Sequence, residues 1–92
     1  MLFALTACST STPSKEKVAE AVKKIMPVKF EVVSVVPLKE IPGVIEVSIR
    51  MDNQPVVFYM DKKAQYVISG SLLHIDSKKN LTNEAQQRIK GK

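Results

Sequence analysis

Few residues in this 92-residue chain could do chemistry, because it has one cysteine, Cys8, and one histidine, His74. A single cysteine excludes an internal disulfide, a Cys-x-x-Cys redox pair and a thiolate zinc cage. A single histidine removes most of the remaining metal and triad chemistry. His74 stands among apolar residues, where a partly buried, hydrogen-bonded side chain is the expected role. The sequence therefore predicts no catalytic residue, no metal site and no cofactor.

The carboxylates and aromatic residues do not change this conclusion. Asp52, Asp61 and Asp76 all fall at expected turns, where aspartate is common because it hydrogen-bonds to the local backbone. Tyr59 and Tyr66 alternate with aliphatic residues, and the glycine-interleaved aromatic signature of RNA-binding strands is absent. A net charge of +5 permits weak attraction to acidic surfaces, but it does not call for nucleic acid as a partner.

The amino terminus has the composition of a targeting segment. Residues 1–7 are almost all apolar, and the polar stretch Ser9–Ser14 follows Cys8. The run Leu5-Thr6-Ala7-Cys8 resembles the lipobox of bacterial lipoproteins. That resemblance implies that Cys8 carries a diacylglycerol and begins the mature chain, so residues 1–13 would be a signal remnant and tether. We expect a periplasmic protein that is lipid-anchored to a bacterial membrane through Cys8.

One feature departs from a complete lipoprotein signal. No lysine or arginine precedes Lys15, whereas such signals begin with a basic segment. The true start would then lie upstream of Met1. The alternative is that Cys8 is an unmodified, buried or incidental cysteine.

Residues 14–92 are expected to form one folded domain that begins with a helix. Ser14 is a suitable N-cap, and Pro27 ends the segment. Between them, apolar residues fall on one stripe at helical spacing: Val18, Val22, Ile25 and Met26.

Strands are expected after Pro27, at 30–36, 45–51, 56–60, 66–68 and 72–75, with turns at Pro42-Gly43, 52–55, 61–65 and 76–79. The clearest is 45–51, where alternation predicts one buried face and one solvated face. The buried set is Ile45, Val47, Ile49 and Met51, and the solvated set is Glu46, Ser48, Arg50 and Asp52. Thr82 can cap a terminal helix that begins at Asn83 and runs toward Ile89. This order predicts an α+β fold in which the first helix covers a curved antiparallel sheet.

The segment Val57–Ile75 resembles the N-terminal domain of DsbC/DsbG-type periplasmic disulfide bond isomerases. It shares a tyrosine-containing strand, an acidic turn, two β-branched residues, a variable residue, a glycine and a hydrophobic strand. The resemblance extends over about Val18–Ile89. It implies a cystatin-like roll and a domain that forms homodimers.

Three departures from that family pattern stand out. Ala64 occupies a turn position where the family usually has glycine, so a different turn type is expected there. His74 stands where the family tends to have an acidic residue. In the isomerases a thioredoxin domain with a Cys-x-x-Cys pair follows the terminal helix, whereas this sequence ends at Lys92.

We expect the homodimer to form by pairing of an edge strand with its copy. The predicted seam consists of six consecutive residues: Tyr66, Val67, Ile68, Ser69, Gly70 and Ser71. Gly70 has no Cβ, so a second backbone can approach it closely. The alternative is that Gly70 marks a β-bulge inside one sheet.

These observations favour a non-catalytic, membrane-tethered dimerisation or protein-interaction module. The partner would be a second copy, an isomerase subunit with the same edge, or an unfolded client protein. Three alternatives remain open: a cystatin-like inhibitor, a chaperone-like client-binding module, and an isomerase fragment without its thioredoxin domain.

Overall fold

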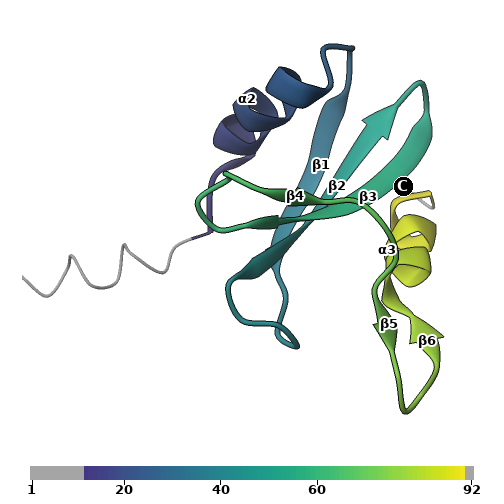
Figure 1. Ribbon diagram of the computed structural model, residues 1–92. Helices are drawn as coiled ribbons and strands as arrows, with labels where there is room; N and C mark the ends of the chain where they lie inside the picture. The colour runs from purple at the N-terminus through teal and green to yellow at the C-terminus, as the bar shows by residue number, and fades with distance from the viewer. Residues whose placement is uncertain (1–11, 91–92) are drawn as a thin grey trace, which may run out of the picture.

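The computed structural model describes residues 12–90, which form an α+β domain. Figure 1 shows a helix on one side of a curved sheet, a second helix on the other, and a small hairpin beyond. The elements in chain order are α2 (Lys15–Ile25), β1 (Glu31–Pro37), β2 (Val44–Met51), β3 (Gln54–Asp61), β4 (Val67–Ile68), β5 (Leu73–His74), β6 (Lys79–Asn80) and α3 (Leu81–Lys90). The predicted fold class is confirmed.

The main sheet has the order β1-β2-β3-β4, and every neighbouring pair is antiparallel. A two-residue turn joins β2 to β3, with φ of 54° at Asp52 and 64° at Asn53. Positive φ at both central residues defines a type I′ turn, whose twist suits adjacent strands. The turn is shorter than predicted, because Pro55 already belongs to β3, where it pairs with Arg50 of β2.

α2 packs its apolar stripe on one face of the sheet. Val18 and Val22 are fully buried, and they join a core formed with Ile45, Val47, Ile49, Phe58 and Met60. The predicted N-cap is confirmed, since the Ser14 hydroxyl oxygen accepts a hydrogen bond from the backbone N–H of Lys17 at 3.1 Å. Ile25 was wrongly placed in the buried stripe, because its side chain is 64% exposed. It faces a hollow between α2 and the β4 end of the sheet, and that hollow stays open because α2 packs chiefly on β1.

The prediction of a solvated second face on β2 is also wrong. Glu46 is 7% exposed and Ser48 is 1% exposed. The reason is α3, which lies across this face and buries Thr82, Ala85 and Ile89 toward the sheet. The sheet is therefore covered on both sides, in the three-layer order α2, sheet, α3 (Figure 1).

The terminal helix begins earlier than predicted, at Leu81, so Thr82 is not its cap. The side chain of Asn80 takes that role, because its Oδ1 accepts a hydrogen bond from the Asn83 N–H at 2.8 Å. Thr82 is instead buried against the sheet, where its hydroxyl is hydrogen-bonded to the Tyr59 hydroxyl and accepts from the Leu72 N–H at 2.9 Å. These bonds join α3 to β3 and to the start of the β5–β6 hairpin.

The predicted 72–75 strand does not join the main sheet. Leu73 and His74 pair with Lys79 and Asn80 in a separate two-stranded sheet. Among residues 12–90, no helix has the length and apolar character needed to span a bilayer.

Glu46 and Arg88 form an ion pair between the sheet and α3, with a distance of 3.2 Å between the carboxylate oxygen and the guanidinium nitrogen. Burial raises the pKa of Glu46, the Arg88 guanidinium opposes that rise, and Glu40 adds to it. Because the pKa of Glu46 is raised in the folded state, the fold favours the protonated carboxyl. Its contribution to stability is fully present below the ordinary pKa of 4.5 and is lost as the pH rises through the raised value.

We predict that Glu46→Gln and Arg88→Gln act in opposite directions at pH 7. Glu46→Gln removes a buried charge, so the variant should be at least as stable as the wild type. Its stability should also no longer fall with rising pH through the titration of residue 46. Arg88→Gln leaves the carboxylate buried without its partner and should cost about 1 kcal/mol. Urea unfolding from pH 4.5 to 7.5 measures both, and a less stable Glu46→Gln would show that attraction to Arg88 outweighs desolvation.

Candidate functional site

β4 is the outer strand at one border of the main sheet, and no described segment pairs with its outer side. It pairs inward with β3 through Val67 opposite Met60 and Ile68 opposite Tyr59. The Tyr66 carbonyl accepts a hydrogen bond from the Asp61 N–H at 3.3 Å. Hydrogen-bonded and non-bonded pairs alternate in antiparallel sheets, so the N–H and C=O of Val67 point away from β3. The strand therefore offers open backbone groups to a further strand.

Of the six residues predicted as a seam, Val67 and Ile68 form β4 and the other four flank it in sequence, and all six are exposed. Exposure reaches 72% for Tyr66 and 58% for Ile68, while Val67 is 37% exposed. Val67 shares the α2 face with Met60, and Ile68 shares the α3 face with Tyr59, because directly paired residues project to the same side. Apolar side chains are thus exposed on both faces of the border strand. Their pairing with another copy stays a prediction.

The border opposite β4 is built differently. β1 contains an irregularity between Val32 and Ser34, and its last residue is Pro37, which has no N–H to donate. Bulges and prolines are the usual means by which sheet edges resist pairing. Of the two borders, the β4 side is the one suited to strand addition.

Asp61 holds the loop that leads into β4. Its Oδ1 accepts hydrogen bonds from the backbone N–H of Gln65 at 2.8 Å and of Tyr66 at 2.7 Å, and its Oδ2 accepts from that of Lys63 at 3.2 Å. The hydrogen bond from the Tyr66 N–H is the largest cause of a lowered pKa at Asp61. Desolvation opposes it, and the bonds from Gln65 and Lys63 add to it. In the same loop Ala64 has a φ of 58°, so this turn has a positive φ although the residue is not glycine.

Gly70 follows β4 and lies outside the ladder, so it is not a bulge in the main sheet. Its φ of 147° is one that residues with a side chain rarely adopt. A Cβ built on Gly70 would meet nothing within 4 Å. The described chain thus brings no backbone close to Gly70, and the glycine is explained here by its φ angle.

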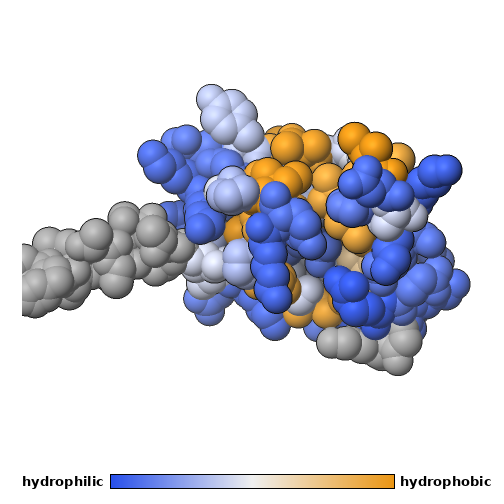
Figure 2. All heavy atoms as spheres, turned by 90° about the horizontal axis from the view of Figure 1, so that it is seen from below, coloured by the Kyte–Doolittle hydropathy of each residue, from blue (hydrophilic) through white to orange (hydrophobic). Residues whose placement is uncertain are grey.

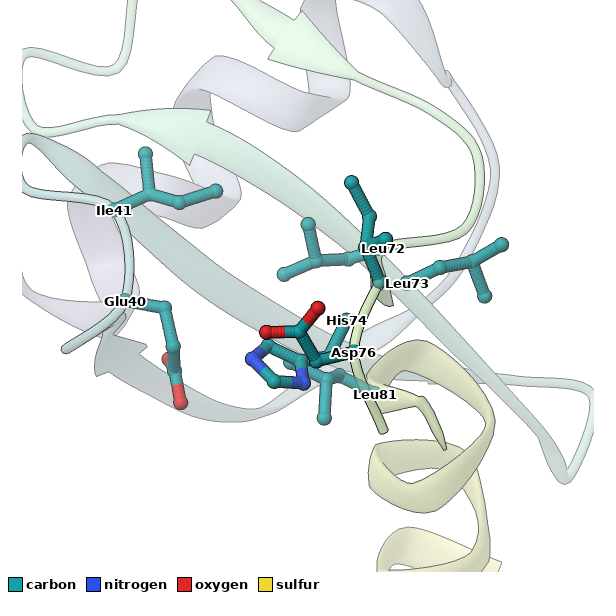
Figure 3. A pocket seen from close by; sticks show the side chains of 8 residues that line it. Glu40, Ile41, Leu72, Leu73, His74, Asp76 and Leu81 are labelled. Atoms are coloured by element: carbon teal, nitrogen blue, oxygen red, sulfur yellow. The ribbon is translucent and has the colours of Figure 1, made fainter. Parts of the chain in front are cut away.

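An open apolar groove of about 400 Å³ lies beside β5. Ile41 lies on one side of it and the β5 segment on the other, as Figure 3 shows. Leu73 is 58% exposed and Ile75 is 86% exposed. Figure 2, which views the molecule from below, shows hydrophobic residues gathered in the middle of this face and hydrophilic ones around them. Sequence reasoning did not single out the groove, although the run Leu72-Leu73 with Ile75 was a signal.

His74, Glu40 and Asp76 also line the groove. His74 is exposed rather than partly buried, and its Nδ1 is hydrogen-bonded to the Ser77 hydroxyl at 2.8 Å. Within residues 12–90, no three His, Cys, Asp or Glu side chains converge into a possible metal site. The β4 edge and the groove present backbone donors and acceptors and apolar side chains, which are groups that suit binding.

Comparison with protein families gives one match: the family described as the disulfide bond isomerase protein N-terminal domain matches residues 9–83. The chain belongs to this family. Neither the curated proteins nor the solved structures gave a significant match.

The match covers most of this isomerase N-terminal domain, from before α2 to the first turn of α3, and so includes β4 and the groove. The suspected relationship is thereby confirmed. Cys8 lies outside the described residues, so its lipidation stays a prediction.

We predict that Asp61→Asn weakens the loop that positions β4. The asparagine amide replaces one accepting oxygen with a donor and removes the charge that strengthens the remaining bonds. A loss of about 1 kcal/mol would lower the melting temperature at pH 7 by about 4–8 °C in a domain of this size. Circular dichroism during heating measures this shift.

The same variant has a characteristic pH dependence. Because the pKa of Asp61 is lowered, its stabilisation is full above the ordinary value of 3.8 and is lost as pH falls through the lowered pKa. Asp61→Asn should lack that part of the acid destabilisation. Asp52→Asn is the matched control, because the type I′ turn accepts either residue. An equal melting shift in both variants would contradict the role of the Asp61 loop.

Proposed function

We propose that this domain is a non-catalytic homodimerisation module whose two copies pair through β4, and that Cys8 anchors it by lipid in the periplasm. Membership of the isomerase N-terminal family supports the proposal. The observation that carries it is the open edge of β4, where the Val67 backbone groups face outward between exposed Tyr66 and Ile68. Two such edges related by a twofold axis can pair with each other antiparallel.

Pairing of β4 alone would not make a stable dimer. The strand has two residues, whereas a specific interface buries about 1,200–2,000 Å² in total. Further along the chain, past Gly70, the side chains of Leu73 and Ile75 are also exposed. We infer that the contact extends from Tyr66 to Ile75, with backbone pairing at one end and apolar contact at the other.

The non-catalytic part of the proposal is supported by the composition of these 92 residues. Thiol-disulfide exchange within one enzyme uses a reactive cysteine pair, and the sequence has Cys8 alone. Cys8 follows three small or apolar residues and precedes a polar stretch without a nearby base or cation in sequence, which suits modification better than reactivity.

Val67→Pro tests the dimer directly. Proline removes the outward N–H of Val67, which no bond to β3 uses, and prolines are tolerated on sheet edges for that reason. We expect the mass measured by light scattering to fall from a dimer to the single chain of 10.2 kDa. The measurement should be made on the full chain under reducing conditions, so that Cys8 cannot link two copies.

Val67→Thr is the matched control, because it keeps the branched shape and the N–H and should remain dimeric. Circular dichroism should show that both variants stay folded. If Val67→Pro does not fold, Ile68→Lys is the substitute. Ile68 is 58% exposed in the single chain, so a lysine there should leave the fold intact and place a charge in the proposed dimer contact. A folded variant that remains fully dimeric would contradict pairing through β4.

The anchor has a separate test. Cys8→Ser, expressed with a start that supplies a basic signal segment, should move the protein from the membrane fraction to the soluble periplasmic fraction. The serine oxygen cannot take the thioether-linked lipid. Fractionation followed by immunoblotting measures the change, and a variant that still sediments with membranes would rule out lipid at Cys8 as the anchor.

A further inference from the structure

The segment that comprises the end of α2 and the first part of the connection to β1 combines positive charge with exposed apolar side chains. It runs from Lys23 to Lys29 with the sequence Lys-Lys-Ile-Met-Pro-Val-Lys, and we call it the basic tip. Ile25 is 64% exposed and Val28 is 52% exposed, while Met26 is half-buried against the core. The tip has three lysines and no acidic residue. Contact with an apolar partner would stabilise these exposed aliphatic groups, because water is a poor environment for them.

The tip protrudes from the domain at the top of Figure 1, where α2 ends and the chain turns into β1. A shallow hollow beside it is lined by Lys23, Pro27, Val28 and Lys29, together with Phe30. Ile25 and Lys24 line the hollow on the other side, toward β4. Apolar and cationic side chains are thus intermixed over the whole tip.

The nearest carboxylates do not cancel this charge. Glu31 is paired with Arg50 at 3.5 Å, so that pair is neutral overall. Asp52 lines a hollow with Lys29, and Glu20 lies one helical turn before Lys24. Glu20 and Asp52 therefore offset part of the charge of Lys24 and Lys29, and the 23–29 segment itself contributes a charge of +3.

We infer that the basic tip is a membrane-docking surface that binds the face of an anionic bilayer reversibly. Ile25 and Val28 would enter the boundary between headgroups and acyl chains, and the three lysines would lie among the lipid phosphates. Charge complementarity selects an anionic surface. A nucleic acid presents the same charge but no apolar layer to receive the two aliphatic side chains, so a bilayer fits both properties.

The position of the tip is compatible with the proposed anchor. From Cys8 to Ser14 the chain can span at most about 20 Å, and the eleven residues of α2 extend about 16 Å. A tether of that reach allows the far end of α2 to contact the bilayer that holds the lipid. The docking itself does not require the anchor, because the tip carries its own apolar and cationic groups.

The test is binding of the full chain to vesicles of phosphatidylcholine with and without phosphatidylglycerol, measured by co-sedimentation. We expect binding to the anionic vesicles alone. It should weaken as salt rises from about 0.1 M to 1 M, which shortens the screening length from about 10 Å to 3 Å. Binding should fall about 100-fold in the variant Lys23→Gln/Lys24→Gln/Lys29→Gln, at roughly fivefold for each lysine.

The matched control removes the same charge from the opposite end of the molecule: Lys39→Gln/Lys78→Gln/Lys79→Gln. This variant should retain most of the binding. A second pair of variants isolates the apolar contribution. Ile25→Ser/Val28→Ser should weaken binding, whereas Val36→Ser/Ile41→Ser, which alters exposed residues outside both the tip and the proposed dimer contact, should not. Equal losses in both lysine variants, equal binding to neutral vesicles, or no binding by the wild type would overturn the proposal.

Light scattering separates this proposal from the dimer. The lysine variant of the tip should keep the oligomeric state of the wild type, because none of its three residues lies on the β4 edge. Conversely, Val67→Pro should still bind anionic vesicles, although more weakly if two tips act together. Loss of dimer in the tip variant would assign these lysines to the interface and contradict a membrane role.

Discussion

The unpaired backbone of β4 is the constraint on which the other features of this domain depend. A buried N–H or C=O without a partner is costly, so a strand that is left open must either face water or meet another strand. β4 faces water in the single chain and is held there by two pairs with β3 and by the Asp61 loop. A short, fixed, uncovered strand differs from a frayed end, because its geometry is already that of a sheet.

The two helices explain why interaction is confined to the borders of the sheet. α2 covers one face through Val18 and Val22, and α3 covers the other through Ala85 and Ile89. Both faces of the central strands are thereby occupied, and neither is open to a partner. What remains uncovered is the β4 edge, the groove beside β5 and the tip after α2. Apart from Val36 at the end of β1, the large hydrophobic side chains that are exposed in the described part of the chain all lie at these places, which suits them to contact with a partner.

The sequence predicted features that depend on local spacing and missed those that depend on distant contacts. Alternation over 45–51 located β2 correctly, and Ser14 was correctly placed as a helix cap. The burial of Glu46 was not predictable from the strand, because it results from a helix that begins 35 residues later. Ile25 has the spacing of a core residue, yet it is exposed where the helix and sheet diverge. At the candidate site, the residues predicted as a seam include the exposed outer strand, and their pairing with a second copy stays a prediction. The groove was not predicted.

The proposed pairing also determines how two tips would be arranged. Antiparallel edge strands that join into one continuous sheet are related by a twofold axis perpendicular to that sheet. Such an axis keeps each face of the sheet on its own side, so both copies of α2 would lie on one side and both copies of α3 on the other. The two basic tips would then project from the same side of the dimer. Two weak contacts on one rigid body make the second binding event intramolecular, which raises avidity without any new contact. Strand pairing and membrane docking would therefore reinforce each other, although each rests on separate residues.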